Sequence, residues 1–463
     1  MVKAKKKYDV LFLGRSVYHF SYYESILSSL IDEYDVNLKI LFDKQWSQNQ
    51  PQESLNTFDN KYNKFLKNNI SIGWFERRKD IFRNFVFVLR ELTTFSSYLS
   101  RKDQSYFYSR RWRSYLPNIW REITRYNFVR KIIGSKLVFF LLKQIENFIP
   151  TSKNIDNFLK NLSPDIIIVS PANMRFSEQT DYLKSAKKLS IKTVVPVLSW
   201  DNLSTKGLFH IKPDLLIAWN KTHELDALKI HNIPKEKILI SGSPFFDKWL
   251  NPELKEDAKD FKSQIGIDED EDYILYLGSS SNIARDETWI IQEISQKLKT
   301  CQSPINKLKI VARPHPANFK NYKKVEGKDI IIWPKEFSLP ESLSSQKTFY
   351  NSVLHSICCI GLNTSGMIDA TIMDKACIAY ITEEYNATQT NAQHFNYLLK
   401  SNIFPLAKNT PEVIQEIGNL IKNNDKYKDA RKRFIKEFVR PSSNFKKAGE
   451  VAANQIINFL NES

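Results

Sequence analysis

The chain has 463 residues, which is enough for two or three domains. Hydrophobic residues make up 42% and aromatic residues 13%, a composition that excludes a disordered chain. The formal net charge is +17, and residues 76–131 alone hold fourteen Lys and Arg against five Asp and Glu, a net +9. Half of the excess charge therefore lies in one segment of 56 residues.

The cellular setting follows from the cysteines and the apolar runs. The four cysteines include no Cys-x-x-Cys pair, which argues against a disulfide framework or a zinc ribbon. The N-terminus lacks the long apolar run of a secretory signal, and LVFFLL at 137–142 is far shorter than the roughly 20 residues of a spanning helix. We expect a cytoplasmic protein, soluble or peripheral on the inner face of the membrane.

Short apolar runs alternate with helical spacing through the first half of the chain. We predict strands at residues 8–13, 36–42, 165–169, 193–198, 215–218 and 237–240, and helices at 21–30, 179–189 and 224–231. A basic, aromatic and helical insertion of about 48–150 interrupts this series. Such alternation predicts a parallel sheet with helices on both faces.

A second alternating series follows a polar stretch at 251–262. We predict strands at 273–277, 309–312, 330–333, 357–361 and 376–381, and helices at 287–298, 349–354 and 367–373. The tail from 411 to 460 is helical by period and broken at Pro441. The expected domains are 1–250 and 251–435, with 436–463 as a C-terminal helix. Ligands of doubly wound sheets bind where the strands end, so we look for the site there.

Three loops of the second domain have side chains suited to an anion. The loop GLNTSG at 361–366 joins a strand to a helix, and its small residues let backbone amides approach a phosphate beside the helix N-terminus. Its candidate ligands are Asn363, Thr364, Ser365 and Gly366; ordinary helix capping is the competing explanation. Asp369, one turn further on, could reach a ribose hydroxyl or serve only the helix dipole.

The other two loops follow the first two strands of that domain. Ser279 and Ser280 lie in GSSSN at 278–282, a weak signal alone because serine loops are common. Arg313 and His315 lie in RPHP at 313–316, where two prolines restrict the backbone. Arginine offers a planar fork for a phosphate, and histidine can donate or carry charge near pH 7.

The first domain has a polar loop that could hold a hydroxyl-rich acceptor. SWDNLSTKG at 199–207 contains Trp200, which could stack on a sugar, together with Asp201, Asn202 and Lys206. A plain Asx turn is the alternative. His19 follows the first strand and could take a proton from an acceptor hydroxyl, although a lone histidine is often structural.

No dinucleotide, P-loop, zincin or esterase motif occurs in the sequence. DEDED at 268–272 contains Asp-x-Asp, the spacing with which some sugar-nucleotide enzymes bind a metal. It precedes a strand, away from the expected site, and reads as a solvated charge run. We assign no metal and expect no cofactor.

The ordered motifs resemble those of a bacterial group of GT-B-type glycosyltransferases of surface-polysaccharide biosynthesis, related to UDP-N-acetylglucosamine 2-epimerases and CDP-glycerol glycerophosphotransferases. The motifs are SWDNLSTKG, AWN at 218–220, GSPFFD at 242–247, YLGSSS at 276–281, RPHP, FYNS at 349–352 and GLNTSGMIDA at 361–370. The resemblance covers most of the chain except roughly 48–110. It implies two Rossmann-like domains facing across a cleft, with a nucleotide-activated donor held by the second, an acceptor held by the first, and a C-terminal helix that returns to the first.

Two departures from the relatives' motifs bear on the chemistry. Gly14-Arg15-Ser16 is not the Gly-Thr-Arg-Pro-Glu turn of the epimerases, which argues against epimerase chemistry. The Asp-Tyr-Ser-Ser of the glycerophosphotransferases is also absent, and Asn363-Thr364-Ser365-Gly366 is found instead.

We therefore expect a metal-independent glycosyltransferase that moves a sugar from a nucleotide-sugar donor to a glycan or lipid-linked acceptor. His19, or failing that Asp201, would be the base. The alternatives are a polyol-phosphate transferase of the CDP-glycerol type, a nucleotide-sugar 2-epimerase and a nucleic-acid-binding protein; nucleic acid is not the expected partner. The basic segment 76–131 could bind an anionic membrane surface or an acidic glycan, or be only a solvated face.

Overall fold

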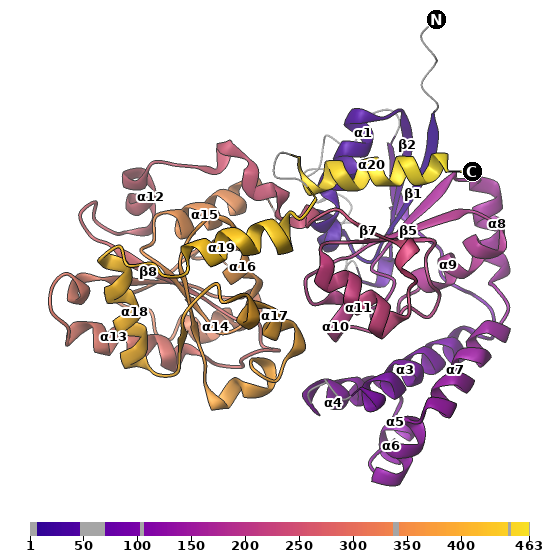
Figure 1. Ribbon diagram of the computed structural model, residues 1–463, viewed down its shortest axis with the longest axis horizontal. Coiled ribbons are helices and arrows are strands. Elements are labelled where there is room, and N and C mark those ends of the chain that lie inside the picture. Colours follow the sequence, from indigo (N-terminus) through magenta and orange to yellow (C-terminus); the bar gives the residue numbers. More distant parts are fainter. Residues whose placement is uncertain (1–6, 47–69, 102–105, 337–341, 443–445, 463) are drawn as a thin grey trace, which may run out of the picture. The chain divides into compact units, whose positions relative to one another are not determined.

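The computed structural model describes residues 7–46, 70–101, 106–336, 342–442 and 446–462. The chain forms two compact units. Unit 1 comprises Met1–Asp247 and Glu437–Ser463, and unit 2 comprises Lys248–Lys436 (Figure 1). The sequence interpretation had placed these boundaries at residues 250 and 435. Each unit is an α/β domain around one parallel sheet, so the predicted pair of Rossmann-like domains is confirmed.

Unit 1 contains a seven-stranded sheet in the order β3-β2-β1-β4-β5-β6-β7. Its strands are β1 (Tyr8–Gly14), β2 (Val36–Phe42), β3 (Ile70–Trp74), β4 (Ile166–Ser170), β5 (Lys192–Pro196), β6 (Leu215–Ala218) and β7 (Ile238–Ile240). The inner strands are continuous aliphatic runs such as the IIIV of β4, because both faces of a parallel sheet are buried under helices. Strand order reverses between β1 and β4, which pair directly.

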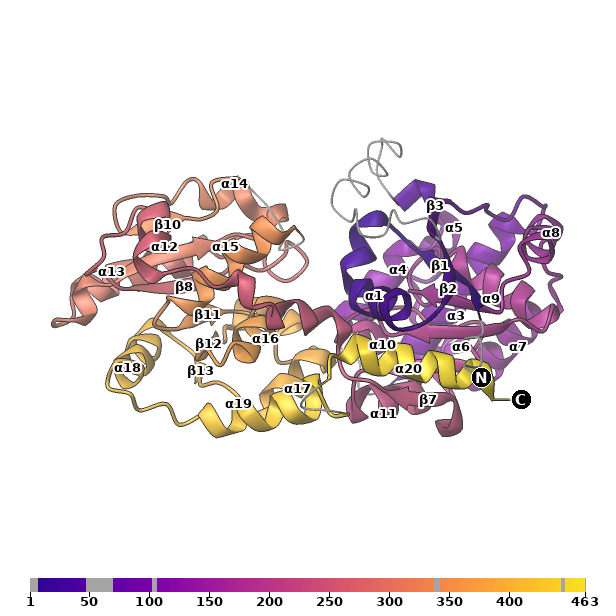
Figure 2. The same cartoon turned by 90° about the horizontal axis from the view of Figure 1, so that it is seen from above.

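Helices cover both faces of this sheet. On one face α1 (Glu24–Glu33) packs beside α20 (Ala448–Asn461), although the two are far apart in the sequence (Figure 2). Asp247 accepts hydrogen bonds from the backbone N–H groups of Ala448 and Gly449, at 3.0 and 2.8 Å, and so caps α20. On the other face lie α8 (Lys153–Leu162) and α9 (Gln179–Lys188), while α11 (Lys221–His231) packs near β6 and β7 beside α10 (Asn202–Thr205).

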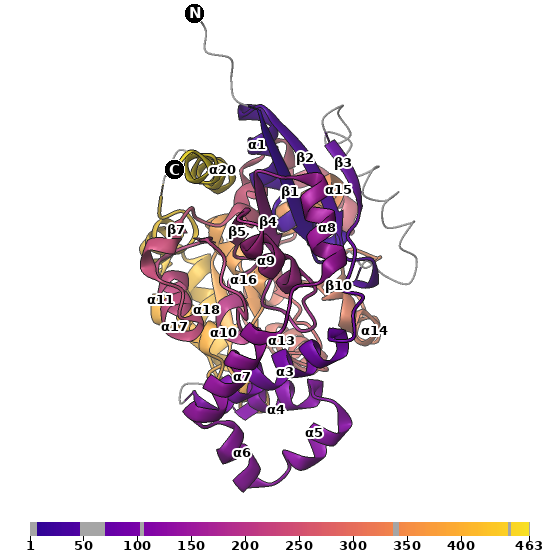
Figure 3. The same ribbon diagram turned by 90° about the vertical axis from the view of Figure 1, so that its right-hand side faces the viewer.

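The helical region of unit 1 lies away from the sheet (Figure 3). It consists of α3 (Arg83–Ser100), α4 (Tyr106–Tyr115), α5 (Asn118–Ile123), α6 (Asn127–Ile133) and α7 (Lys136–Phe148). The predicted insertion of about 48–150 was too long, because β3 within it pairs with β2 as an edge strand of the sheet. ISIGW lacks the long aliphatic run that identified the other strands, since an edge strand is less buried. Residues 47–69 of the predicted insertion lie outside the described part of the chain.

Unit 2 repeats the same strand order in a six-stranded sheet, β10-β9-β8-β11-β12-β13. The strands are β8 (Tyr273–Leu277), β9 (Lys309–Arg313), β10 (Ile330–Ile332), β11 (Cys359–Gly361), β12 (Cys377–Tyr380) and β13 (Leu406–Ala407). The helices are α12 (Ala258–Ile265), α13 (Thr288–Lys299), α14 (Phe319–Tyr322), α15 (Leu343–Leu354), α16 (Ser365–Ile372), α17 (Gln393–Ser401), α18 (Thr410–Ile421) and α19 (Lys428–Phe434). One core fills the space between β8–β9 and helices α13 and α18.

Candidate functional site: a phosphate-binding edge in unit 2

The central strands of unit 2 bring three predicted loops to one edge of the sheet. Leu277, the last residue of β8, pairs with Arg313 of β9 on one side and with Gly361 of β11 on the other. The loops that follow these strands therefore begin at the same level. Strand order reverses between β8 and β11, which is where doubly wound sheets bind their ligands.

Arg313 is the most unusual side chain at this edge. It is only 6% exposed, and both terminal guanidinium nitrogens are buried without a hydrogen-bond acceptor among the described residues. Its Cζ lies 5.1 Å from the centre of the Phe349 ring. Burial lowers the pKa of Arg313 to about 10, so the group remains charged at neutral pH. A buried and unneutralised fork of N–H donors is suited to a phosphate.

The loop after β8 lies against Arg313 because Gly278 has no side chain. The Gly278 N–H donates to the Arg313 carbonyl at 2.9 Å. A Cβ at Gly278 would lie 2.6 Å from the Tyr322 hydroxyl and 3.0 Å from the backbone nitrogen of His315. Any larger residue would therefore push the β8 and β9 loops apart.

Glu287 holds the loop after β8 in place through hydrogen bonds, a role that the sequence did not reveal. Its carboxylate accepts from the backbone N–H of Ser279, from Tyr322 at 2.8 Å and from Tyr276 at 3.1 Å. Burial raises its pKa to about 7. In the sequence an acid at the start of a helix looks like an ordinary dipole partner. Ser279 is fully buried at this anchor, and Ser280 is half-buried.

His315 is held in one tautomer by its own loop. Its Nδ1 accepts from the Ala317 N–H at 3.2 Å, so in the neutral ring Nε2 carries the proton and is the donor. Burial lowers its pKa and favours this neutral form. His315 therefore offers a neutral N–H, next to the charge of Arg313.

The GLNTSG loop leads into α16 as predicted. Some of its side chains cap the helix, and others hold the loop in place. Thr364 is the N-cap and accepts from the Gly366 N–H at 3.4 Å, while Ser365 is exposed as the first helical residue. Asn363 is buried; its amide donates to the Thr388 carbonyl, and its Nδ2 lies 3.2 Å from His394 Nε2. The alternative explanation, helix capping, thus applies to Thr364, whereas Asn363 ties the loop to the following segment.

Asp369 is linked to Arg313 through two stacked aromatic rings, those of Trp249 and Phe349. Its Oδ1 accepts from Trp249 Nε1 at 2.6 Å, and the Trp249 ring stacks on Phe349 at 5.2 Å between centroids. Burial raises the pKa of Asp369 to about 6, against the weaker opposing effect of Lys248. Trp249 was not predicted as a site residue. Phe349 had entered only through the FYNS motif, since neither position carries an obvious chemical signal.

In unit 1 the predicted acceptor residues form a closed polar loop after β5. Asp201 accepts from Ser199 at 2.6 Å and from Thr205 at 2.9 Å, and it pairs with Lys206 at 3.0 Å. Both oxygens of Asp201 are thus engaged within its own loop. Trp200 and Asn202, the remaining predicted acceptor ligands, are buried at 8% and 1% exposure.

His19 lies in a 3₁₀ turn, Val17–Tyr22, directly after β1. Burial lowers its pKa to about 4, with smaller contributions from the nearby cations Arg15 and Lys206. Its Nδ1 is buried and finds no hydrogen-bond partner within the described ranges. The ring is therefore neutral at physiological pH and able to accept a proton.

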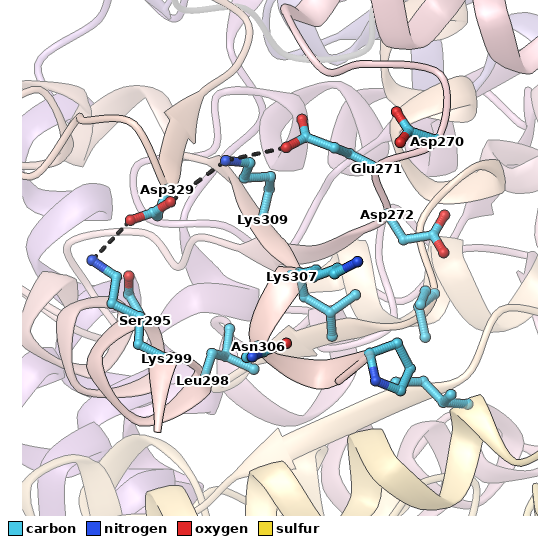
Figure 4. A pocket seen from close by; sticks show the side chains of 14 residues that line it. Asp270, Glu271, Asp272, Ser295, Leu298, Lys299, Asn306, Lys307, Lys309 and Asp329 are labelled. Atoms are coloured by element: carbon cyan, nitrogen blue, oxygen red, sulfur yellow. Dashed lines mark hydrogen bonds and ion pairs between the residues drawn. The ribbon is translucent and has the colours of Figure 1, made fainter. Parts of the chain in front are cut away.

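The Asp-x-Asp run lies at the opposite edge of the unit 2 sheet from the three loops. Asp270–Asp272 line a pocket of about 360 Å³ at the amino ends of β8 and β9 (Figure 4). Lys309 lies 3.4 Å from Glu271 and 3.5 Å from Asp329 in this pocket. In the part of the chain that the structure describes, no group of three or more His, Cys, Asp or Glu could hold a metal ion.

Comparisons with solved structures show which folds the chain resembles. The fold is similar to that of MnaA from S. aureus, solved with UDP, with a TM-score of 0.54 at 11% identity over 98% of this chain and 96% of that one. It is similar also to the UDP-GlcNAc 2-epimerase from Neisseria meningitidis bound to UDP-GlcNAc, with a TM-score of 0.54 at 12% identity over 98% and 100% of the two chains. None of the curated proteins matches the chain.

The family model of the CDP-Glycerol:Poly(glycerophosphate) glycerophosphotransferases matches residues 206–444. This range is more than half of the chain and includes all three loops at the β8–β9–β11 edge. The chain is thus a member of the CDP-glycerol:poly(glycerophosphate) glycerophosphotransferase family, with the two-domain fold of the GT-B enzymes.

Proposed function

We propose that the protein transfers a polyol phosphate from a CDP-activated donor to a polymeric acceptor in cell-surface polymer synthesis. Arg313 carries the proposal: its terminal nitrogens have no acceptor among the described residues, and a buried charge without a partner costs free energy unless a ligand supplies the opposite charge. The family supports the donor class, since its name specifies CDP-glycerol. This reverses the order of the sequence interpretation, which placed sugar transfer first and polyol-phosphate transfer second.

The reaction requires one bond to form and one to break at phosphorus. The acceptor hydroxyl oxygen bonds to the phosphorus that carries the polyol, and the bond from that phosphorus to the bridging oxygen of CMP breaks. CMP leaves with the bonding electron pair, and the hydroxyl proton passes to a base. Arg313 and the Nε2–H of His315 would stabilise the charge that develops on the phosphate oxygens.

We propose His19 as the base in preference to Asp201. The neutral His19 ring has a buried nitrogen without a partner in the described part of the chain, whereas both Asp201 oxygens already accept hydrogen bonds. The N-terminus of α16 at Thr364–Ser365 adds partial positive charge for the donor phosphates. Asp369 keeps its proposed ribose contact through the oxygen that Trp249 does not use.

Sugar transfer from a nucleotide sugar is the second candidate. Its support is the fold relative that binds UDP-GlcNAc, together with Asn363-Thr364-Ser365-Gly366 in place of Asp-Tyr-Ser-Ser. In that reaction the acceptor oxygen bonds to the sugar carbon, the bond from that carbon to the diphosphate oxygen breaks, and a nucleoside diphosphate leaves. The same cations would stabilise either leaving group.

Mass spectrometry of purified protein with CDP-glycerol, CDP-ribitol and UDP-GlcNAc separates the candidates. We expect CMP release from a CDP-polyol, dependent on an added acceptor. If UDP-GlcNAc releases UDP and neither CDP-polyol releases CMP, the second candidate is established. If the protein binds none of the three donors, both proposed reactions are refuted. Arg313→Ala should reduce kcat/KM by about a hundredfold or more. The matched control is Arg285→Ala, which removes an exposed arginine of the same unit.

A further inference from the structure

The basic segment seen in the sequence divides into two parts in the structure. Its first cations hold α3 and the preceding loop to the body of unit 1. Arg78 lies 3.3 Å from Asp181, Arg83 lies 3.1 Å from Glu178, and Arg90 lies 3.0 Å from Asp181. Arg77 pairs with Asp43 in the same way. These four charges are structural and are not offered to an external partner.

The exposed apolar side chains gather further along, on α5, α6 and α7. Ten of the nineteen large hydrophobic side chains exposed in the described part of the chain lie within residues 118–148. We call this set the α5–α7 face: Ile119, Ile123, Tyr126, Phe128, Ile132, Leu137, Phe140, Leu141, Ile145 and Phe148. A cluster of this kind on a soluble surface marks an interaction site.

Helix α7 shows this exposure of apolar side chains most clearly. One side of the helix packs on the protein, and its other, apolar side faces outward. Its inner side packs against α3 through Leu142, and Glu146 is buried against Arg90. Its outer side carries Leu137, Phe140 and Phe148, which are 67%, 56% and 85% exposed. Their spacing places them along one side of the helix.

The charge on α5–α7 is predominantly positive. Residues 118–148 contain Arg121, Arg125, Arg130, Lys131, Lys136 and Lys143. The acids are Glu122, which pairs with Arg125 at 2.7 Å, and the buried Glu146. Apolar side chains rimmed by Lys and Arg are complementary to an anionic lipid surface.

Trp112, an aromatic residue of the basic segment, is not available to stack on a nucleic-acid base. Trp112 is 3% exposed and stacks on Tyr98, at 5.6 Å between centroids. Most of the α5–α7 face is instead Leu, Ile and Phe, which suit acyl chains better than bases. In the described ranges no helix is long and apolar enough to cross a bilayer, so binding would be interfacial.

We propose that the α5–α7 face docks unit 1 on an anionic lipid bilayer, with its apolar side chains in the interface and its cations at the headgroups. This moves the contact from the 76–131 segment of the sequence interpretation to residues 118–148. The inference is independent of the donor chemistry proposed above.

Co-sedimentation of the full-length protein with vesicles tests this surface. One set of vesicles contains phosphatidylglycerol and phosphatidylcholine in equal amounts, and the other contains phosphatidylcholine alone. Wild-type protein should bind the anionic vesicles at low salt and dissociate as the ionic strength rises well above about 0.15 M, where the Debye length falls below about 8 Å. No binding to the anionic vesicles would overturn the proposal.

Two triple variants locate the contact. Leu137→Ser with Phe140→Ser and Phe148→Ser should weaken binding by about tenfold or more through lost apolar burial. Arg125→Gln with Lys131→Gln and Lys136→Gln should weaken it by about a hundredfold, because each cation near the surface contributes about 1 kcal/mol. All six side chains are exposed, so folding should be unchanged.

Matched controls change three exposed apolar residues and three exposed cations elsewhere. Leu225, Leu343 and Leu406 are exposed and become Ser in one control; Lys422, Lys426 and Lys428 are exposed and become Gln in the other. Equal losses in variants and controls would overturn the proposed face. The proposal would also be overturned if the protein bound no vesicles but bound a single-stranded oligonucleotide tightly, and if the apolar triple variant bound that oligonucleotide equally well.

Discussion

The guanidinium of Arg313 lies over the ring of Phe349, 5.1 Å from Cζ to the ring centre, with no described acceptor for its terminal nitrogens. A second buried arginine of unit 2 does have acidic partners. Arg431 is 2% exposed and lies 2.7 Å from Asp425 and 3.3 Å from Asp374. Both arginines are buried, but within the described ranges only Arg431 has carboxylates beside it. We interpret Arg313 as a charge kept for a ligand.

Replacing each arginine by methionine should therefore change stability in opposite directions. Arg313→Met removes an uncompensated buried charge and should stabilise the protein by about 1 kcal/mol while abolishing transferase activity. Arg431→Met leaves the partly exposed Asp374 and Asp425 without their cation and should destabilise the protein by about 1 kcal/mol. Denaturant unfolding measures both. A loss of stability in Arg313→Met as large as in Arg431→Met would show that Arg313 is structural.

Replacing Gly278 even by alanine should weaken donor binding. The added Cβ would meet Tyr322 at 2.6 Å and would separate the β8 and β9 loops. Gly278→Ala should raise KM for the donor by about tenfold, because a displacement of this size misplaces Arg313 relative to the phosphate. Gly327→Ala is the control, since nothing lies within 4 Å of its Cβ. Steady-state kinetics decide, and equal KM values for the two variants would contradict the prediction.

Glu287 should make stability depend on pH in a defined direction. Burial raises its pKa from 4.5 to about 7, so the native state holds this proton more tightly than the unfolded state. Between pH 4.5 and 7 the free energy of unfolding should therefore fall as pH rises, by on the order of 3 kcal/mol from this group. Glu287→Gln keeps an acceptor for Ser279 and Tyr322 and should remove that fall.

The exposed Glu253 gives the comparison for this measurement, with Glu253→Gln expected to leave the pH dependence of unfolding unchanged. Urea unfolding at half-unit pH steps measures all three proteins. A wild-type curve that rises between pH 4.5 and 7 relative to Glu287→Gln would mean that the hydrogen bonds from Ser279, Tyr322 and Tyr276 outweigh burial.

His19 predicts the acidic side of the pH–rate profile. A base with its pKa lowered to about 4 is already deprotonated at pH 5, so kcat/KM should show no acidic limb near 6.5. His19→Gln should lose activity at every pH. His355→Gln is the control, since that ring lies 3.1 Å from the Glu256 carbonyl in unit 2. An acidic limb near 6.5 would contradict the lowered pKa of His19, and full activity in His19→Gln would exclude His19 as the base.

Strands were predicted well wherever both faces of the sheet are covered. The bounds of β2, β6 and β8 match the predicted residues, because their aliphatic runs are set by burial on both sides. β3 and β13 were missed. Both lie at sheet edges, where a short strand needs few apolar residues and its identity comes from the neighbour with which it pairs.

The candidate site was found through loops and completed by packing. Arg313, His315 and the GLNTSG loop stood out because polar residues directly followed predicted strands. Glu287 and Trp249 did not, because their roles depend on contacts with Ser279 and Asp369 that the sequence does not reveal. Asp201 also looked available in the sequence, and only the fold surrounds it with Ser199, Thr205 and Lys206.

By itself the sequence determined the two α/β domains, the polar character of three loops that directly follow strands, and the existence of a basic segment. These follow from local composition and from the position of residues after strands. Only the tertiary structure decided which charges are available to a ligand. Burial and pairing are properties of neighbours distant in the chain: Arg90 is neutralised by Glu146 and Asp181, whereas Arg313 is left charged beside Phe349.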